Sequence, residues 1–140
     1  MTTQSEQHLE NELVQQLATL GYASVKIQDE AAILANLKTQ LEAFNATTFS
    51  DKEFKALLNH LEKGNVFQRA KTLRDRFVLR REDGTKFYVR FFDDQDPTQN
   101  RFQVTQQVTI EGIRKNRYDV TLLVNGLPLV QIELKKRGLE

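Results

Sequence analysis

The feature that most constrains the fold is a change of hydrophobic period near Leu73. Before this point, apolar residues recur every three or four positions, which is typical of helices that bury one face. After it, short apolar runs alternate with turn residues, which is typical of strands. Helices followed by a run of strands favour an α/β or α+β fold with a mixed sheet flanked by helices. No linker interrupts the pattern, so residues 1–140 are expected to form one domain.

Local signals place the helices of the first half. The stretch SEQHLENELVQQLATLGY predicts a first helix that ends at a glycine, and residues 22–27 predict a short strand. Asp29 is the expected cap of a second helix. Ser50 and Glu53 form a capping-box pattern for a third, and Asn65 is the expected start of a fourth.

The second half contains two hairpin patterns. In RFVLRREDGTKFYVRFF, two runs flank Asp83-Gly84, and in RYDVTLLVNGLPLVQIELKK, two runs flank Asn125-Gly126. Residues 102–110 predict a further strand between them. The second hairpin is unusual, because Asp119 lies near its start and Glu133 and Lys135 lie near its end.

The turn of this hairpin decides whether the two carboxylates share a face. Directly opposed residues of an antiparallel pair lie on one face, and their numbers sum to a constant. A two-residue turn that pairs Val124 with Leu127 gives an odd sum, which sends Asp119 and Glu133 to opposite faces. We therefore expect a three-residue loop, closed by Gly126 in the left-handed conformation, to restore an even sum.

Two converging carboxylates need a positive partner, since like charges repel. Carboxylate oxygens suit Mg²⁺, which can ionise a bound water, and a lysine nearby can stabilise charge that develops on a phosphate. The alternative is a surface salt bridge between Lys135 and Glu133 or Asp119. On spacing alone, the salt bridge is the favoured reading, because an Asp followed by a downstream Glu-x-Lys is common in sequences.

Composition excludes several classes of protein. The chain has no cysteine, which excludes disulfides and thiolate metal sites and fits a reducing cytoplasm. No apolar run approaches the ~20 residues of a membrane-spanning helix. With 20 Lys and Arg against 19 Asp and Glu, the net charge is +1, so DNA contacts would have to come from local patches.

The residues around the hairpin carry a family resemblance. The segment NRYDVTLLVNGLPLVQIELKKRG resembles the nuclease segment of the motor-and-nuclease (R) subunit of type I restriction enzymes. The stretches SEQHLENELVQQLATLGY, AAILANLKTQLEAFN and NRFQVTQQVTIEG resemble the opening helix, second helix and preceding strand of that family. The resemblance is weakest from about Thr47 to Phe92. It implies the PD-(D/E)xK nuclease fold, a mixed sheet flanked by helices.

The resemblance also implies roles for residues of the hairpin. Asp119, Glu133 and the Leu134 carbonyl would bind Mg²⁺, and Lys135 would be the catalytic lysine. Tyr118 replaces the proline for which the superfamily is named. A glutamate from the first helix often joins such a site, and Glu6 or Glu10 is the candidate here, with Glu6 preferred for its Ser-Glu pattern. The alternative is a carboxylate that only complements the helix dipole.

Basic residues near the proposed site are candidates for DNA-phosphate contacts. The sequence offers Arg114, Lys115, Arg117, Lys136 and Arg137. A further cluster, formed by Lys71, Arg74 and Arg76, is interpreted as solvated surface.

The family implies a larger enzyme around this chain. The expected function is an Mg²⁺-dependent endonuclease domain that cuts double-stranded DNA after ATP-driven translocation. The ATP site would lie in a translocase part outside this chain, and methylation (M) and specificity (S) subunits would be partners. We expect an N-terminal piece, truncated at its C-terminal side, with weak or no activity alone. The alternatives are another nuclease of the superfamily and a non-catalytic DNA-binding or assembly module.

Overall fold

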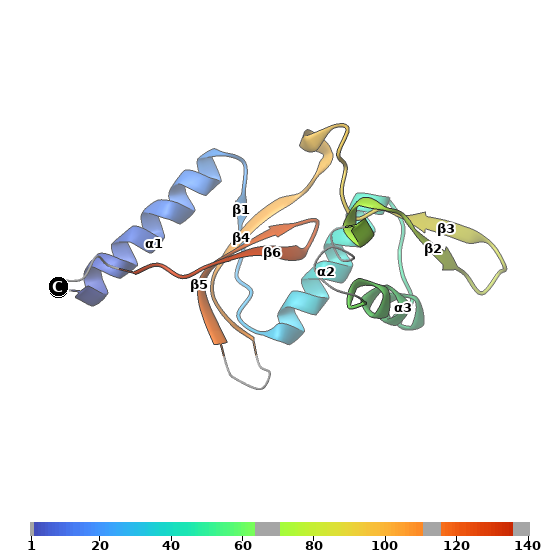
Figure 1. Cartoon of the computed structure of the whole chain (residues 1–140), viewed down its shortest axis with the longest axis horizontal. Coiled ribbons are helices and arrows are strands. Elements are labelled where there is room, and N and C mark those ends of the chain that lie inside the picture. Colours follow the sequence, from blue (N-terminus) through green and yellow to red (C-terminus); the bar gives the residue numbers. More distant parts are fainter. Residues whose placement is uncertain (1, 64–70, 111–115, 136–140) are drawn as a thin grey trace.

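A computed structural model of the chain describes residues 2–63, 71–110 and 116–135. Figure 1 shows helices on either side of a central sheet and, at the far end of the molecule, a further helix beside a separate hairpin. The helices are α1 (Thr2–Thr19), α2 (Glu30–Asn45) and α3 (Asp51–Leu61). The predicted fold class, a mixed sheet flanked by helices, is confirmed.

The expected helix caps form as predicted. The Asp29 carboxylate accepts a hydrogen bond from the Ala32 N–H at 2.8 Å, which starts α2. At the start of α3, the Ser50 hydroxyl accepts from the Glu53 N–H at 3.1 Å, and the Glu53 carboxylate accepts from the Ser50 N–H at 2.8 Å. The expected fourth helix falls largely on residues 64–70, outside the described part of the chain, although residues 71–74 are helical.

The main sheet has four strands in the order β1-β4-β5-β6. These are β1 (Ala23–Ser24), β4 (Phe102–Ile110), β5 (Asn116–Val124) and β6 (Leu127–Ile132). β1 runs parallel to β4, and the other neighbours are antiparallel, which makes the sheet mixed. The predicted hairpin at Asp83-Gly84 forms a separate two-stranded sheet from β2 (Phe77–Arg80) and β3 (Lys86–Val89). A short 3-10 helix (Pro97–Gln99) precedes β4.

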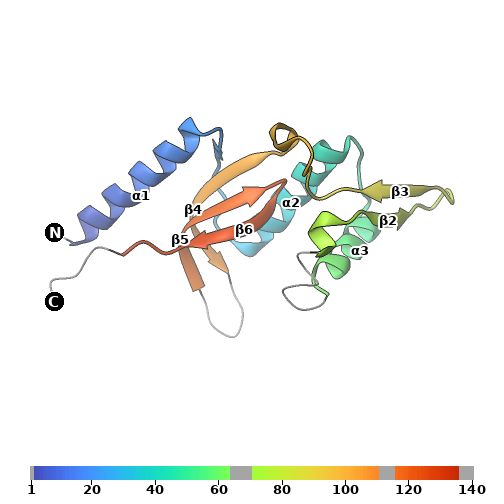
Figure 2. The same cartoon turned by 45° about the horizontal axis from the view of Figure 1, so that its top comes forward.

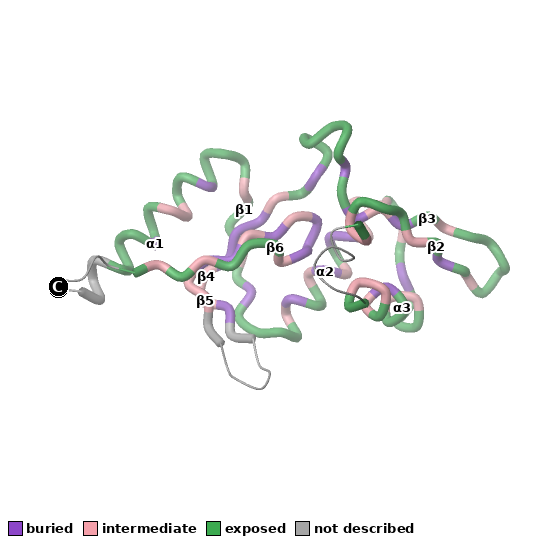
Figure 3. Tube along the Cα trace, viewed as in Figure 1, coloured by how far each residue is buried: buried purple, intermediate pink, exposed green. Residues whose placement is uncertain are grey.

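Apolar side chains cover both faces of the main sheet. On the α1 side, Leu17 packs with Val104 and Val120. On the α2 side, Ile33 packs with Val108 and Leu123, together with Ile27. Figure 2 shows α1 and α2 on opposite sides of the sheet, and Figure 3 shows buried residues concentrated along its strands. A third cluster joins α2 and α3 to the β2–β3 hairpin.

The prediction for the turn of the β5–β6 hairpin was wrong, but the predicted register is confirmed. Asn125 and Gly126 form a two-residue turn with φ values of 52° and 84°, and Val124 pairs with Leu127. The register then shifts between Leu122 and Leu123, so that Leu122 pairs with Val130 and Val120 with Ile132. A β-bulge beside Pro128 thus supplies the extra residue that we had assigned to the turn.

Candidate active site

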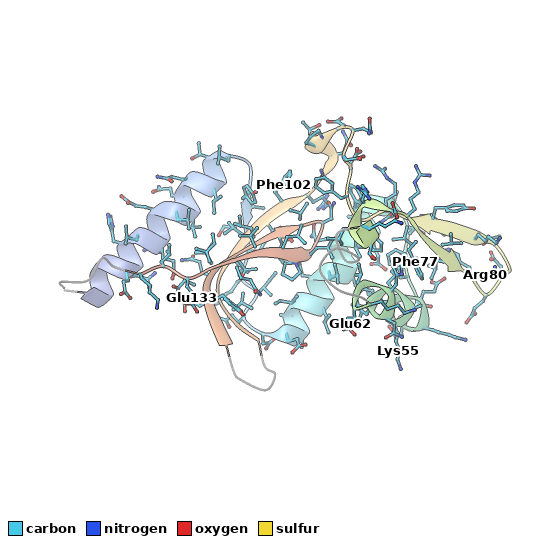
Figure 4. The ribbon with its side chains drawn as sticks, viewed as in Figure 1. Lys55, Glu62, Phe77, Arg80, Phe102 and Glu133 are labelled. Carbon is cyan, nitrogen blue, oxygen red and sulfur yellow. The ribbon has the colours of Figure 1, made fainter. Side chains whose placement is uncertain are left out.

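Asp119 lies near the start of β5, opposite the segment that follows β6. Val120 pairs with Ile132. The same register, continued by one residue on each strand, places Asp119 opposite Glu133, so their side chains point to one face of the hairpin. The Asp119 Oδ2 atom accepts a hydrogen bond from the Leu134 N–H at 2.7 Å. Figure 4 shows Glu133 at this open end of the hairpin, where the chain runs from β6 toward α1. Asp119 therefore fixes the backbone between Glu133 and Lys135.

Glu10 is the second carboxylate at this end of the hairpin. It belongs to α1 and is only 4% exposed. Its Oε1 atom accepts a hydrogen bond from Gln107 Nε2 at 2.6 Å, and its Oε2 atom accepts one from Gln106 Nε2 at 2.5 Å. The Gln107 Nε2 atom also lies 3.5 Å from Asp119 Oδ1. Gln107 thus links a helix carboxylate to a strand carboxylate.

The two candidate glutamates of α1 have different surroundings. Glu6 is exposed, whereas Glu10 is buried beside β4. The buried stripe continues through Leu13, Val14 and Leu17, which follow Glu10 at helical spacing. The structure therefore brings Glu10, and not Glu6, to Asp119.

The charges of the site are not neutralised by one another. Within the described residues, Glu10, Asp119 and Glu133 form no ion pair, and Lys135 forms none with either carboxylate of the hairpin. Glu133 and Lys135 are exposed, and Leu134 is half-buried. The salt bridge that we considered as an alternative is therefore not formed.

The donor chemistry of this region fits a hard cation such as Mg²⁺. Glu10 and Asp119 supply carboxylate oxygens, and the Leu134 backbone, already bonded to Asp119, carries a carbonyl. Among the described residues, the side chains that donate to the buried Glu10 carboxylate are the amides of Gln7, Gln106 and Gln107, which are neutral. Across the described ranges, however, no three His, Cys, Asp or Glu side chains gather in one place. The exposed Glu133 side chain forms no hydrogen bond with the Glu10–Gln107–Asp119 network among the described residues.

Most of the predicted DNA-contact residues fall outside the described part of the chain. Arg114, Lys115, Lys136 and Arg137 lie there, and Arg117 pairs with Thr109 as part of β5. Sequence reasoning missed Gln106 and Gln107. The signal was present, because VTQQV places three successive polar residues in the middle of a strand that is apolar on alternate positions, and Gln106 stands where an apolar residue is due.

Comparison with known proteins identifies the class of protein that this fold and site define. Residues 3–140 match the family described as the N terminus of the type I restriction enzyme R protein, and the chain belongs to that family. Within the described residues, no helix is both long and apolar enough to cross a membrane.

Individual relatives carry more specific names. The chain is 46% identical over 145 residues to the type I restriction enzyme SauCOLORF180P endonuclease subunit of Staphylococcus aureus, and 43% identical to the SsaAORF53P endonuclease subunit of Staphylococcus saprophyticus. Both matches cover 100% of this chain and 16% of the relative. The EcoprrI endonuclease subunit of Escherichia coli is 39% identical over 96% of this chain and 45% of its own length. The chain therefore spans less than half of the length of these relatives.

Proposed function

We propose that this chain is the Mg²⁺-dependent DNA endonuclease domain of a type I restriction enzyme R subunit. One observation carries the proposal: Asp119 is bonded to the backbone between Glu133 and Lys135, and Gln107 connects it to the buried Glu10. Two linked carboxylates at the open end of a hairpin that also carries Glu133 and Lys135, with no ion pair among the described residues to neutralise them, support a site for a divalent metal ion in a nuclease.

Each residue has a role in this proposal. Asp119, Glu133 and the Leu134 carbonyl would hold Mg²⁺, and Glu10 would be the additional carboxylate from α1. The bound ion would supply a water of lowered pKa and charge stabilisation at the phosphate. Lys135 would place its ammonium beside the scissile phosphate, where it stabilises developing negative charge and orients the attacking water.

The rest of the enzyme would lie outside this chain. Double-stranded DNA is the proposed substrate, and Arg114, Lys115, Arg117, Lys136 and Arg137 are proposed phosphate contacts. ATP would be used only by a translocase part of the subunit, and methylation (M) and specificity (S) subunits would complete a cytoplasmic complex. The names of the relatives as endonuclease subunits support this assignment.

The test measures DNA cleavage and ATP hydrolysis in the intact subunit with its partners. We expect Lys135→Ala to abolish cleavage of unmethylated plasmid while ATP hydrolysis continues. Lys55→Ala is the control, because Lys55 is an exposed lysine of α3, far from the hairpin's open end (Figure 4). Cleavage at the parental rate by Lys135→Ala would refute the assignment of the site.

A second measurement separates a nuclease from a non-catalytic DNA-binding or assembly module. Asp119→Ala should lose Mg²⁺ or Mn²⁺ binding in titration calorimetry, whereas Lys135→Ala should retain it, because an ammonium is not a metal ligand. Equal metal affinity in Asp119→Ala and the parent would favour the non-catalytic module. The 140-residue chain alone should cut DNA weakly or not at all, since positioning of catalytic groups tolerates little error.

A further inference from the structure

Gln107 interrupts the regular alternation of β4. Its φ is 58°, in the left-handed region that residues other than glycine seldom adopt. On one side of it, Val104 packs against Leu17 of α1, and on the other, Val108 packs against Ile33 of α2. Residues four apart in a regular strand point to the same face. After the left-handed residue, the side chains of β4 therefore point to the opposite face of the sheet from the one that regular alternation predicts.

The inversion does not come from an inserted residue. Gln106 pairs with Val120 and Val108 pairs with Tyr118, so the register between β4 and β5 is the same before and after Gln107. What changes is the direction of the side chains. Two successive residues, Gln106 and Gln107, both donate to the Glu10 carboxylate, although neighbours in a regular strand point to opposite faces. The unfavourable φ of Gln107 thus brings both amides to the same carboxylate.

The chemistry of the amide group explains what this arrangement achieves. Two ionised carboxylates accept hydrogen bonds but cannot donate one, so Glu10 and Asp119 cannot bond to each other. The Gln107 amide nitrogen donates to Glu10 at 2.6 Å and lies 3.5 Å from Asp119. A lysine or arginine there would neutralise their charge and compete with a cation. A glutamine holds both carboxylates and leaves their charge intact.

We propose that Gln107, supported by Gln106, is a positioning residue that holds Glu10 and Asp119 at the spacing a divalent cation requires. This inference rests on the proposed metal-dependent function. The left-handed backbone aims the amide at the two carboxylates, and the amide keeps the pair assembled before the metal binds. Residues that orient metal ligands typically change metal affinity by about 10- to 100-fold when they are replaced.

Two substitutions separate the amide from the backbone. Gln107→Gly and Gln107→Ala both remove the amide, but only glycine adopts the left-handed conformation without strain. We expect both variants to bind Mn²⁺ about tenfold or more weakly in titration calorimetry. Both variants remove a donor from the buried Glu10, so both should lower the melting temperature, and Gln107→Ala should lower it further because alanine is strained in the left-handed conformation. Gln107→Asn keeps an amide and tolerates the left-handed backbone, so it should recover part of the affinity.

A spectroscopic measurement tests the contact directly. In ¹⁵N-edited spectra, the side-chain amide signals of Gln106 and Gln107 should broaden when substoichiometric paramagnetic Mn²⁺ is added, and those of the exposed Gln15 should not. Asp119→Ala should abolish the broadening.

The outcomes distinguish this inference from the proposed function. If the parent chain binds Mn²⁺ and Asp119→Ala does not, the metal site stands; unchanged affinity in Gln107→Gly would then overturn the positioning role alone. If the parent does not bind Mn²⁺ at the carboxylates, the proposed function and this inference both fail.

Discussion

The two ends of the β5–β6 hairpin use polar residues in opposite ways. At the closed end, Asn125 is fully buried, and its amide bonds the Phe91 carbonyl at 2.9 Å, the Asn100 side chain at 3.0 Å and the Arg101 N–H at 2.8 Å. At the open end, the described residues that donate hydrogen bonds to Glu10 and Asp119 are neutral amides and a backbone N–H. At the closed end, the side-chain amide of Asn125 is paired inside the protein, whereas at the open end Glu10 and Asp119 have no ion-pair partner among the described residues.

Gly126 makes the closed end sensitive to small changes. A Cβ atom at this position would lie 2.7 Å from Leu37 Cα and 3.0 Å from Gln40 Cβ, both in α2. The hairpin turn is thus pressed against the helix that covers the sheet. The turn does more than reverse the chain, because it also docks β5 and β6 onto α2.

The largest effect is expected from Gly126→Ala. The new methyl group collides with α2 backbone, and alanine at a φ of 84° is strained, so the variant should lose about 3 kcal/mol or more of unfolding free energy. Urea denaturation followed by circular dichroism measures the loss. Gly84→Ala is a matched control, because Gly84 has the same φ of 84° and nothing within 4 Å of its Cβ position. It should lose only about 1 kcal/mol, and equal losses would show that contact with α2 is unimportant.

The next effect is expected from Asn125→Gly. Glycine keeps the left-handed turn but leaves the Phe91 carbonyl and the Arg101 N–H without their buried partner. Each unsatisfied buried group costs about 1–3 kcal/mol, so we expect a loss of about 2 kcal/mol in the same denaturation assay. Asn125→Ala should lose slightly more, since it adds backbone strain. If Asn125→Gly is as stable as the parent, water replaces the amide and the closed end is less complete than its contacts indicate.

Sequence reasoning succeeded where local patterns determine structure. The Asp29 cap, the Ser50–Glu53 capping box and the hairpin at Asp83-Gly84 each depend on neighbouring residues, and each is confirmed. It failed at the Asn125-Gly126 turn, because one extra residue at any point along a hairpin restores the register that places Asp119 and Glu133 on one face. Turn type is encoded locally, whereas a bulge near Pro128 depends on how β6 packs.

The candidate site was predictable only in part for the same reason. Asp119, Glu133 and Lys135 stood out by their positions in the hairpin, but their assignment to a site came from the family resemblance. Their metal and catalytic roles remain predictions. The network of Glu10 with Gln106 and Gln107 brings together α1 and β4, which are far apart in the sequence. It also depends on an inverted strand that periodicity rules do not anticipate.

At the open end, Asp119→Asn should have a much smaller effect on stability. An asparagine oxygen can still accept from the Leu134 N–H, and removing one charge relieves repulsion with Glu10. We therefore expect a melting temperature at or above that of the parent and a change in unfolding free energy below about 1 kcal/mol. Binding of Mn²⁺ should nevertheless be lost. A large destabilisation would mean that the open end, like the closed end, serves mainly to hold the fold together.

The smallest effect concerns Asp93, whose backbone bonds Asn100 in the loop that supports Asn125. The Asp96 N–H holds the pKa of the Asp93 carboxyl below its ordinary value of 3.8, with help from Arg90 and the Gln95 N–H. A carboxyl with a lowered folded pKa contributes stability that is present above its unfolded pKa. That contribution is lost as the pH falls through the lower folded pKa.

The closed end should therefore weaken in acid, below about pH 4. Asp93→Asn cannot ionise, so its melting temperature should be lower than that of the parent at pH 7 and should fall less steeply below pH 4. Calorimetric melting of both proteins between pH 3 and 7 measures the difference. Parallel curves would mean that the ionised Asp93 does not stabilise this loop, and that the closed end depends on neutral hydrogen bonds alone. Such a result would sharpen the contrast with the open end, where the described carboxylates accept hydrogen bonds but form no ion pair with another described residue.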